Sequence, residues 1–231
     1  MMKSIKKLIG LIILVTGVFS CQENTEGRVV VDFTRDWQFI KSDTLPTTAE
    51  QWRTLDLPHD WSIEGSFSED HPAGVGGGAL PGGIGWYKKN FTVDSSLDRY
   101  FLQFDGVYQN STVWVNGDSV GTRPNGYISF EYDITPYVKP EANNEVLVRV
   151  KNSPQPNSRW YSGSGIYREV RLVQTKGIYI PNYGVYVKPE LLAGKGQVSV
   201  LTDIINDSNQ DAELQVSYEV ISPNGESVYT Q

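Results

Sequence analysis

The residues most suited to recognising a ligand lie just before a glycine-rich bend. Arg159, Trp160 and Tyr161 precede Gly163 and Gly165, and glycine permits a positive φ and a close approach of the backbone. An exposed Arg-Trp-Tyr cluster at such a bend suits a surface that stacks on a sugar ring or contacts a neighbouring domain. The alternative is a buried Trp160 that anchors the last strand of a sandwich, because tryptophan is usually mostly buried.

The acidic residues do not suggest a catalytic pair. Asp105, Asp118 and Asp133 fall at predicted turns, where aspartate favours hydrogen bonds to its own backbone. The other acids considered are predicted to lie in a long loop or on the solvated surface: Glu64, Glu69, Asp70, Glu141, Glu145, Asp207 and Asp211. We therefore predict no catalytic residues among these 231 residues.

Metal, nucleotide and nucleic-acid sites are not expected either. His59 and His71 lie in predicted loops with no third ligand type nearby, which argues against a metal site. The glycines at 76–78 and 82–83 are not followed by Lys-Ser/Thr or by a helical pattern, so a phosphate-binding loop is excluded. A formal net charge of −7 argues against a nucleic-acid partner. We predict no metal and no cofactor.

Residues 1–20 have the features of a secretory signal peptide. Lys3, Lys6 and Lys7 form a basic start, and the apolar stretch 8–19 is too short to span a bilayer comfortably. Such a segment is removed on export and takes no part in the fold.

Cys21 follows the signal and is the only cysteine, so no intramolecular disulfide is possible. Its place behind Ser20 resembles a bacterial lipoprotein cleavage site, which predicts lipidation of the Cys21 thiol. An ordinary signal with a neighbouring cysteine is the alternative. The expectation is an exported bacterial lipoprotein of the periplasm or outer membrane, held at the membrane through Cys21, with residues 21–28 as a tether.

The elements that must position the Arg159–Trp160 cluster read as short strands. The chain is rich in Gly, with 22, and in aromatic residues, with 13 Tyr and 6 Trp, a composition typical of all-β proteins. Nine or ten short alternating segments lie between residues 29 and 175, separated by turn signals such as Asn116-Gly117. We predict a jelly-roll β-sandwich, of the galactose-binding-like kind, over residues 29–175.

A second group of predicted strands begins after residue 175. Residues 176–231 contain about four further alternating segments, whereas an immunoglobulin-like sandwich needs about seven strands. The expectation for 176–231 is an incomplete, truncated immunoglobulin-like domain with an open sheet edge, which invites swapping or aggregation.

Several motifs in order resemble a known family. The segments that carry the resemblance are Leu57–Ile63, Gly85–Phe91, Phe104–Val107, Val113–Gly117, Gly126–Tyr127, Asp133–Thr135 and Arg159–Arg168. Together they resemble glycoside hydrolase family 2, and most closely its bacterial β-galactosidases. The combination is specific to the family but not to one sugar.

The resemblance implies a glycosidase of carbohydrate metabolism with a sugar-binding domain, an immunoglobulin-like domain and a TIM barrel. In the family the barrel carries two glutamates that hydrolyse O-glycosidic bonds with retention. Nothing in these residues resembles the motifs of that barrel, so the resemblance implies that the chain by itself is inactive. A free-standing carbohydrate-binding lipoprotein and an inactive truncated product are the alternatives.

By matched position, the resemblance also implies accessory substrate contacts from loops of the jelly roll. The residues concerned are His59, Asp60, Tyr108, Asn110, Arg159 and Trp160. Polar groups among them would hydrogen-bond sugar hydroxyls, and Trp160 would stack on a ring face. For Asp60 the alternative is a carboxylate that caps nearby backbone. The implied partners are a β-galactoside or related glycan and the missing barrel.

Overall fold

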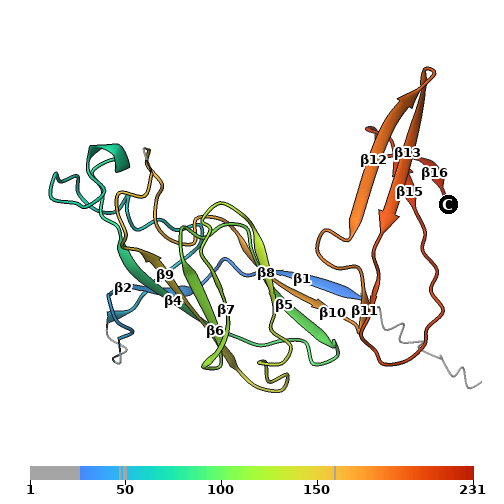
Figure 1. Ribbon diagram of the computed structural model, residues 1–231. Coiled ribbons are helices and arrows are strands. Elements are labelled where there is room, and N and C mark those ends of the chain that lie inside the picture. The colour runs from blue at the N-terminus through green and yellow to red at the C-terminus, as the bar shows by residue number, and fades with distance from the viewer. Residues whose placement is uncertain (1–26, 47, 49–50, 159) are drawn as a thin grey trace, which may run out of the picture.

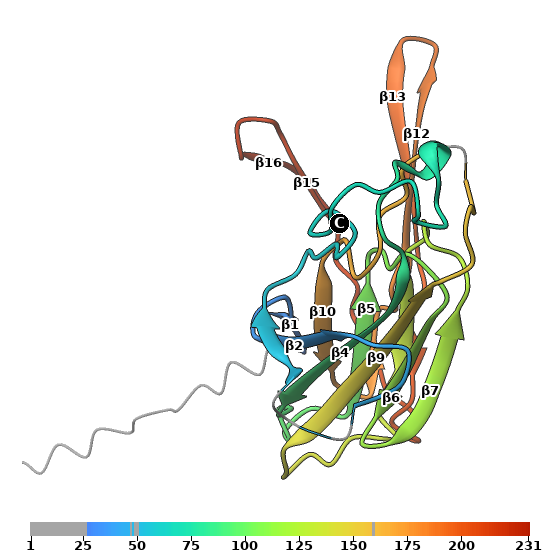
Figure 2. The ribbon, with the colours of Figure 1, turned by 90° about the vertical axis from the view of Figure 1, so that its left-hand side faces the viewer.

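The computed structural model describes residues 27–46, 48, 51–158 and 160–231. Residues 28–175 form two antiparallel sheets that pack face to face (Figures 1 and 2). This arrangement confirms the all-β sandwich expected from the sequence. The signal segment and Cys21 lie outside the described residues.

Four strands form the smaller sheet and six form the larger. The smaller sheet has the order β1 (Arg28–Asp32), β10 (Val170–Thr175), β5 (Arg99–Phe104) and β8 (Phe130–Asp133). The larger sheet has the order β3 (Arg53–Leu55), β2 (Trp37–Lys41), β4 (Gly83–Phe91), β9 (Asn144–Asn152), β6 (Ser111–Val115) and β7 (Asp118–Arg123). Apart from the consecutive pairs β2–β3 and β6–β7, neighbours in each sheet are not consecutive in sequence, as in a jelly roll.

The core lies between the two sheets and follows from the alternation along each strand. In β9, Val146, Val148 and Val150 are fully buried while Glu145 and Lys151 are exposed, because successive side chains of a strand point to opposite faces. The largest buried side chains are aromatic. The indole of Trp37 satisfies its N–H by donating to the Phe33 carbonyl at 2.7 Å.

The strand after the glycine bend begins later than the alternation predicts. The pattern predicts a strand from Ile166, but β10 begins at Val170. The carbonyl of Ile166 instead accepts a hydrogen bond from the His59 amide at 2.8 Å, and Gly165 forms an isolated bridge with Tyr108. Residues 165–166 are therefore committed to the loops at the end of the sandwich rather than to the sheet.

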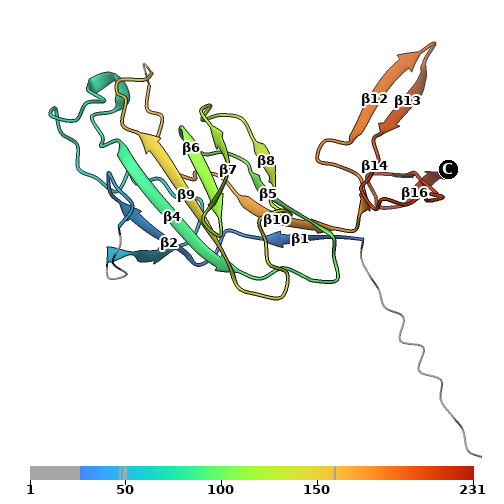
Figure 3. The ribbon, with the colours of Figure 1, turned by 60° about the horizontal axis from the view of Figure 1, so that its bottom comes forward.

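Residues 176–231 form three separate two-stranded pairs. The pairs are β11 (Ile178–Tyr179) with β14 (Ile205–Asn206), β12 (Val185–Leu192) with β13 (Lys195–Thr202), and β15 (Glu219–Ile221) with β16 (Ser227–Thr230). The β12–β13 hairpin points away from the sandwich (Figures 1 and 3). Within residues 185–231, all of which the structure describes, no residue is buried.

The first pair is fixed to the sandwich. Arg99 on β5 forms an ion pair with Asp207 at 3.1 Å, and the Tyr179 ring packs on Phe101 with centroids 5.4 Å apart. The hydroxyl groups of Ser129 and Tyr183 lie 2.7 Å apart. Residues 176–184 are thus a structured joint, and the exposed hairpins begin beyond it.

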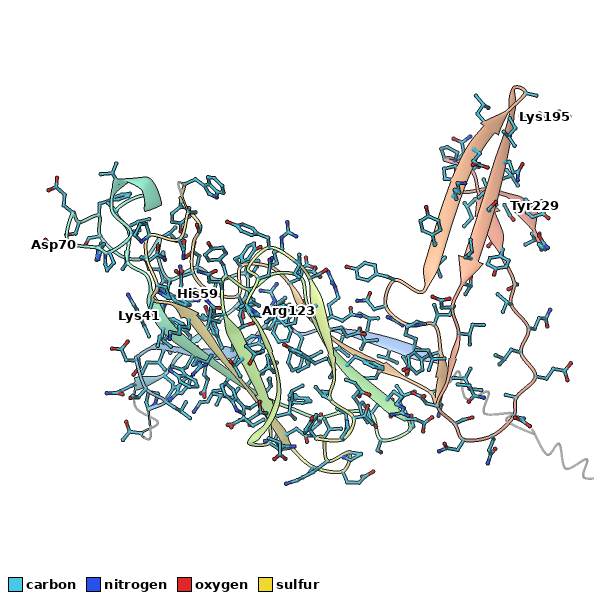
Figure 4. The ribbon with its side chains drawn as sticks, viewed as in Figure 1. Lys41, His59, Asp70, Arg123, Lys195 and Tyr229 are labelled. Carbon is cyan, nitrogen blue, oxygen red and sulfur yellow. The ribbon has the colours of Figure 1, made fainter. Side chains whose placement is uncertain are left out.

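Residues 64–82 form a long loop at one end of the sandwich, with the short 3₁₀ turn η2 (Val75–Gly77) inside it. Figure 4 shows Asp70 at the outer part of this loop and His59 inside the body of the sandwich. Within the described residues, no helix has the length and apolar character needed to cross a membrane.

We expect limited proteolysis to separate the two parts of the chain. A two-stranded hairpin without a packed face is marginally stable in water, so residues 185–231 should be cleaved first. A resistant fragment should extend to about residue 183, because the Tyr183 hydroxyl is hydrogen-bonded to Ser129 of the sandwich. Mass spectrometry of the products gives the boundary, and resistance of residues 185–231 equal to that of the sandwich would contradict this expectation.

Candidate functional site

A cleft opens at the loop end of the sandwich, between segments that join different pairs of strands. It has a volume of about 500 Å³. Its lining residues come from the β5–β6, β7–β8 and β9–β10 connections: Tyr108, Gln109, Asn125, Gly126, Tyr127, Asn157, Ser158 and Trp160. The cleft therefore combines aromatic rings with side-chain amides.

Two aromatic side chains are open to solvent and a third forms the wall behind them. Trp160 is 62% exposed and Tyr127 is 55% exposed, whereas Tyr108 is 3% exposed. The rings of Tyr108 and Tyr127 meet edge to face, with centroids 5.3 Å apart, and the Trp160 indole N–H donates to the Tyr127 hydroxyl at 3.4 Å. The exposure of Trp160 decides against the alternative of a buried anchor.

Gly126 is required for this packing. A Cβ atom at position 126 would lie 2.2 Å from Cδ2 of Tyr108, which is closer than any tolerable contact. The Gly126 carbonyl accepts a hydrogen bond from the Tyr167 hydroxyl at 2.7 Å, and the Asn125 side chain accepts from the Tyr127 amide at 2.8 Å. The segment that carries Tyr127 is therefore held from both sides of the glycine.

The structure separates the six residues expected to contact substrate. Tyr108 and Trp160 line the cleft. Asn110 lies beside it, where its amide N–H donates to the Pro124 carbonyl at 3.2 Å and its side chain donates to the Lys151 carbonyl at 3.4 Å. Arg159 lies outside the described residues. His59 and Asp60 lie behind the cleft, in contacts of their own.

The Asp60 carboxylate is surrounded by donors. One oxygen accepts hydrogen bonds from the backbone amides of Ser62 at 2.9 Å and Ser164 at 2.8 Å, and the other accepts from the Tyr161 hydroxyl. Burial, this hydrogen bond and the charge of Asp60 raise the pKa of Tyr161 well above its usual range. Asp60 thus joins the 60–62 segment to the 161–164 loop, as a backbone cap does.

His59 is a buried histidine with a partner at each ring nitrogen. Its Nδ1 lies 2.7 Å from the Tyr87 hydroxyl, and its Nε2 lies 3.2 Å from Oε1 of Glu64. The ring also packs on Phe39, with centroids 4.5 Å apart. Burial lowers the pKa of His59 below its usual value, although the charge of Glu64 acts in the opposite direction. Burial raises the pKa of the Tyr87 hydroxyl, so it favours the neutral form of both side chains.

Sequence reasoning missed part of the cleft. Gln109, Asn125, Tyr127 and Asn157 line it but were not predicted as contacts. Tyr127 belongs to the quoted Gly126–Tyr127 motif, and an aromatic residue beside a glycine between two strands was the available signal. The amides gave no signal, because Asn is also favoured in turns.

One pair of carboxylates meets outside the cleft. Asp105 and Glu169 both bind the Nη2 atom of Arg171, at 2.8 and 2.5 Å. These hydrogen bonds and the nearby negative charges raise the pKa of Arg171, and burial opposes them. Within the described residues, no group of three His, Cys, Asp or Glu side chains is placed to hold a metal ion.

Comparison with known proteins agrees with this architecture. Residues 72–176 match the family description "Glycosyl hydrolases family 2, sugar binding domain". The chain is 46% identical to the β-galactosidase BoGH2A of Bacteroides ovatus over 92% of its own length and 26% of that protein. It is 30% identical to a β-glucuronidase of Bacteroides fragilis, with coverages of 76% and 26%.

The fold is also found in solved structures. A β-glycosidase from Bacteroides vulgatus superposes with a TM-score of 0.78 and 36% identity, over 87% of this chain and 27% of that one. The chain spans about a quarter of the length of these relatives.

The two-sheet sandwich and the match over residues 72–176 place this domain in the class of jelly-roll sugar-binding domains found in glycosidases. This chain carries the N-terminal domain of glycoside hydrolase family 2, and the resemblance read from the seven motifs is confirmed.

We expect His59 to reduce stability in mild acid. Because its folded pKa is lowered, the unfolded chain binds a proton that the native chain does not as the pH falls through the ordinary histidine value of 6.5. The free energy of unfolding should therefore fall with pH in this range. Urea titrations over this pH range should show a flatter dependence of the unfolding free energy on pH for His59→Gln than for the wild type. Equal slopes for wild type and His59→Gln would contradict the assignment.

Proposed function

We propose that residues 28–175 bind a carbohydrate in the aromatic–amide cleft and thereby form an accessory part of a substrate site in a β-galactosidase-like enzyme. The observation that carries the proposal is the pairing of exposed aromatic faces with amide groups. Trp160 and Tyr127 are open to solvent, and Asn125, Asn157 and Gln109 line the same cleft.

This combination suits a sugar for a physical reason. The apolar C–H face of a pyranose packs on an aromatic ring, while its hydroxyls need donors and acceptors close to the ring edge. An amide side chain offers both a donor and an acceptor. Tyr108 adds a rigid wall, because its hydroxyl already donates to Oδ1 of the Asn157 side chain at 3.2 Å.

The chemistry itself is assigned to a part of the enzyme beyond these residues. Relatives named β-galactosidase are about four times as long as the matched segment, and in a retaining glycosidase two carboxyl groups stand about 5–5.5 Å apart across the scissile bond. In this chain Asp60 is occupied by backbone amides, and Asp105 and Glu169 are held by Arg171. The proposed role is substrate binding, with hydrolysis supplied by a TIM barrel.

Removal of an exposed ring should weaken sugar binding. We expect Trp160→Ala and Tyr127→Ala each to raise the Kd for methyl β-galactoside by about tenfold or more, which corresponds to about 1.4 kcal/mol of lost stacking. Calorimetric titration of the purified chain measures this, with methyl β-glucuronide as a second ligand. Tyr186→Ala is the matched control, since Tyr186 has the same 62% exposure as Trp160 but lies on β12.

Two results would contradict the proposal. One is the absence of heat with either sugar at millimolar concentration. The other is an equal loss of affinity in the Tyr186→Ala control, which would place binding away from the cleft.

The purified chain should not hydrolyse a β-galactoside. Asp60 is held by backbone amides, and Asp105 and Glu169 are held by Arg171, so none of these three acids is free to protonate the leaving oxygen while another attacks. A chromogenic nitrophenyl β-galactoside assay should give the rate of the buffer alone. Turnover that accompanies the purified chain and disappears in Glu169→Gln would assign chemistry to the Asp105–Glu169 pair and overturn this expectation.

A further inference from the structure

A buried amide at the end of β9 organises the loop that carries Trp160. Asn152 is 2% exposed. Its Nδ2 donates to the Gly163 carbonyl at 2.8 Å and to the Ser164 hydroxyl at 2.7 Å. Its Oδ1 accepts from Asn157 at 2.7 Å and from Gln155 at 2.9 Å. The Gly163 carbonyl can only accept, so its contact fixes the orientation of the Asn152 amide.

These partners belong to the two stems of one loop. Residues 153–169 connect β9 to β10, and the described part of this connection contains no strand of its own. Gln155 and Asn157 lie on the first stem, and Gly163 and Ser164 on the second. Between the stems, the Ser158 and Ser162 hydroxyls lie 2.7 Å apart, which is a local contact within the loop. The Asn152 side chain therefore joins the two stems, in addition to the Ser158–Ser162 contact, and its loss would return conformational freedom to part of the loop.

The same amide reaches the opposite wall of the cleft. Asn157, bound to Asn152, accepts the hydroxyl of Tyr108 at 3.2 Å. The Gln109 side chain donates to Asn152 Oδ1 at 3.5 Å, and the Gln109 carbonyl accepts from the Lys151 amide at 3.0 Å. The two walls of the cleft thus share a buried anchor in Asn152, which is itself absent from the lining.

We propose that Asn152 is a positioning residue for the cleft, which sets the Trp160 loop against Tyr108 and so determines its affinity for a sugar. The effect on affinity rests on the proposed function. The effect on the loop does not, because it follows from the hydrogen bonds alone. If Asn152 had only a general structural role, its replacement would lower the stability of the chain but would change neither amide exchange in the loop nor the affinity for a sugar.

Asn144, at the other end of β9, is the matched control. It is also an asparagine, is 1% exposed, and hydrogen-bonds through both ends of its amide. Its Oδ1 accepts from the Lys139 amide at 2.7 Å and from Asn116 at 2.8 Å, and its Nδ2 donates to the Ala142 carbonyl at 3.0 Å. None of these partners lines the cleft.

The experiment compares Asn152→Ala and Asn144→Ala in the full chain by thermal unfolding, hydrogen exchange and calorimetry with methyl β-galactoside. Both variants should lose stability, because each leaves buried polar partners unsatisfied. Only Asn152→Ala should speed amide exchange in residues 155–163, by about tenfold. It alone should also raise the Kd for methyl β-galactoside by about tenfold. Asn144→Ala should speed exchange only near residues 139–143 and leave the Kd within about twofold of wild type.

Gln155→Ala provides a second test if Asn152→Ala does not fold. Gln155 donates to Asn152 but does not line the cleft. Its loss should therefore speed amide exchange in residues 153–158 and raise the Kd for methyl β-galactoside by a smaller factor than Asn152→Ala does. Unchanged exchange at 155–163 in a folded Asn152→Ala, or at 153–158 in Gln155→Ala, would overturn the positioning role. If exchange changes as expected but the wild-type chain binds neither methyl β-galactoside nor methyl β-glucuronide, the sugar-binding function fails and the loop anchor stands.

Discussion

The loop end of the sandwich depends on one position where no side chain fits. Gly165 exchanges two backbone hydrogen bonds of 2.9 Å with Tyr108, at a φ of 131° that is rare outside glycine. A Cβ atom there would lie 2.5 Å from the His59 carbonyl and 2.5 Å from the Tyr87 hydroxyl. Because three chain segments meet at this point, the loops that carry Asp60, Tyr108 and Trp160 cannot move independently.

This convergence explains why the residues expected to contact substrate divide into two groups. The His59 amide donates to the Ile166 carbonyl and the Trp61 amide donates to the Ser164 carbonyl, so the 59–61 segment lies against the inner side of the loop. The side chains of His59 and Asp60 make their hydrogen bonds within the protein on that side. The outer side of the same loop carries Trp160 into solvent, where it faces Tyr127. One loop therefore separates a structural interior from a surface able to receive a ligand.

The two parts of the chain differ in burial rather than in strand content. The sandwich places Trp37, Tyr87 and Phe104 at full burial between its sheets, and such aromatic side chains supply much of a small core. The β12–β13 hairpin has regular pairing along eight residues but leaves Leu191 77% exposed. Hydrogen bonds of a hairpin exchange for hydrogen bonds to water with little net gain, so pairing alone does not replace a core.

The sequence alone determined the class of fold, because period-2 alternation and turn signals are local properties. The Asn116-Gly117 turn, the valine face of β9 and the ordered family motifs could all be read without coordinates. Trp160 was singled out by its place before the glycine bend, and Tyr108 was found through the family resemblance. The amides of Asn125, Asn157 and Gln109 were not, because their meeting depends on three connections that are distant in sequence. Only the tertiary structure decided that Trp160 is exposed, that the Asp60 carboxylate caps backbone, and that Asn152 anchors both stems of one loop. The exposure of a side chain and its hydrogen-bond partners depend on how distant segments pack together, so a local sequence pattern does not predict them.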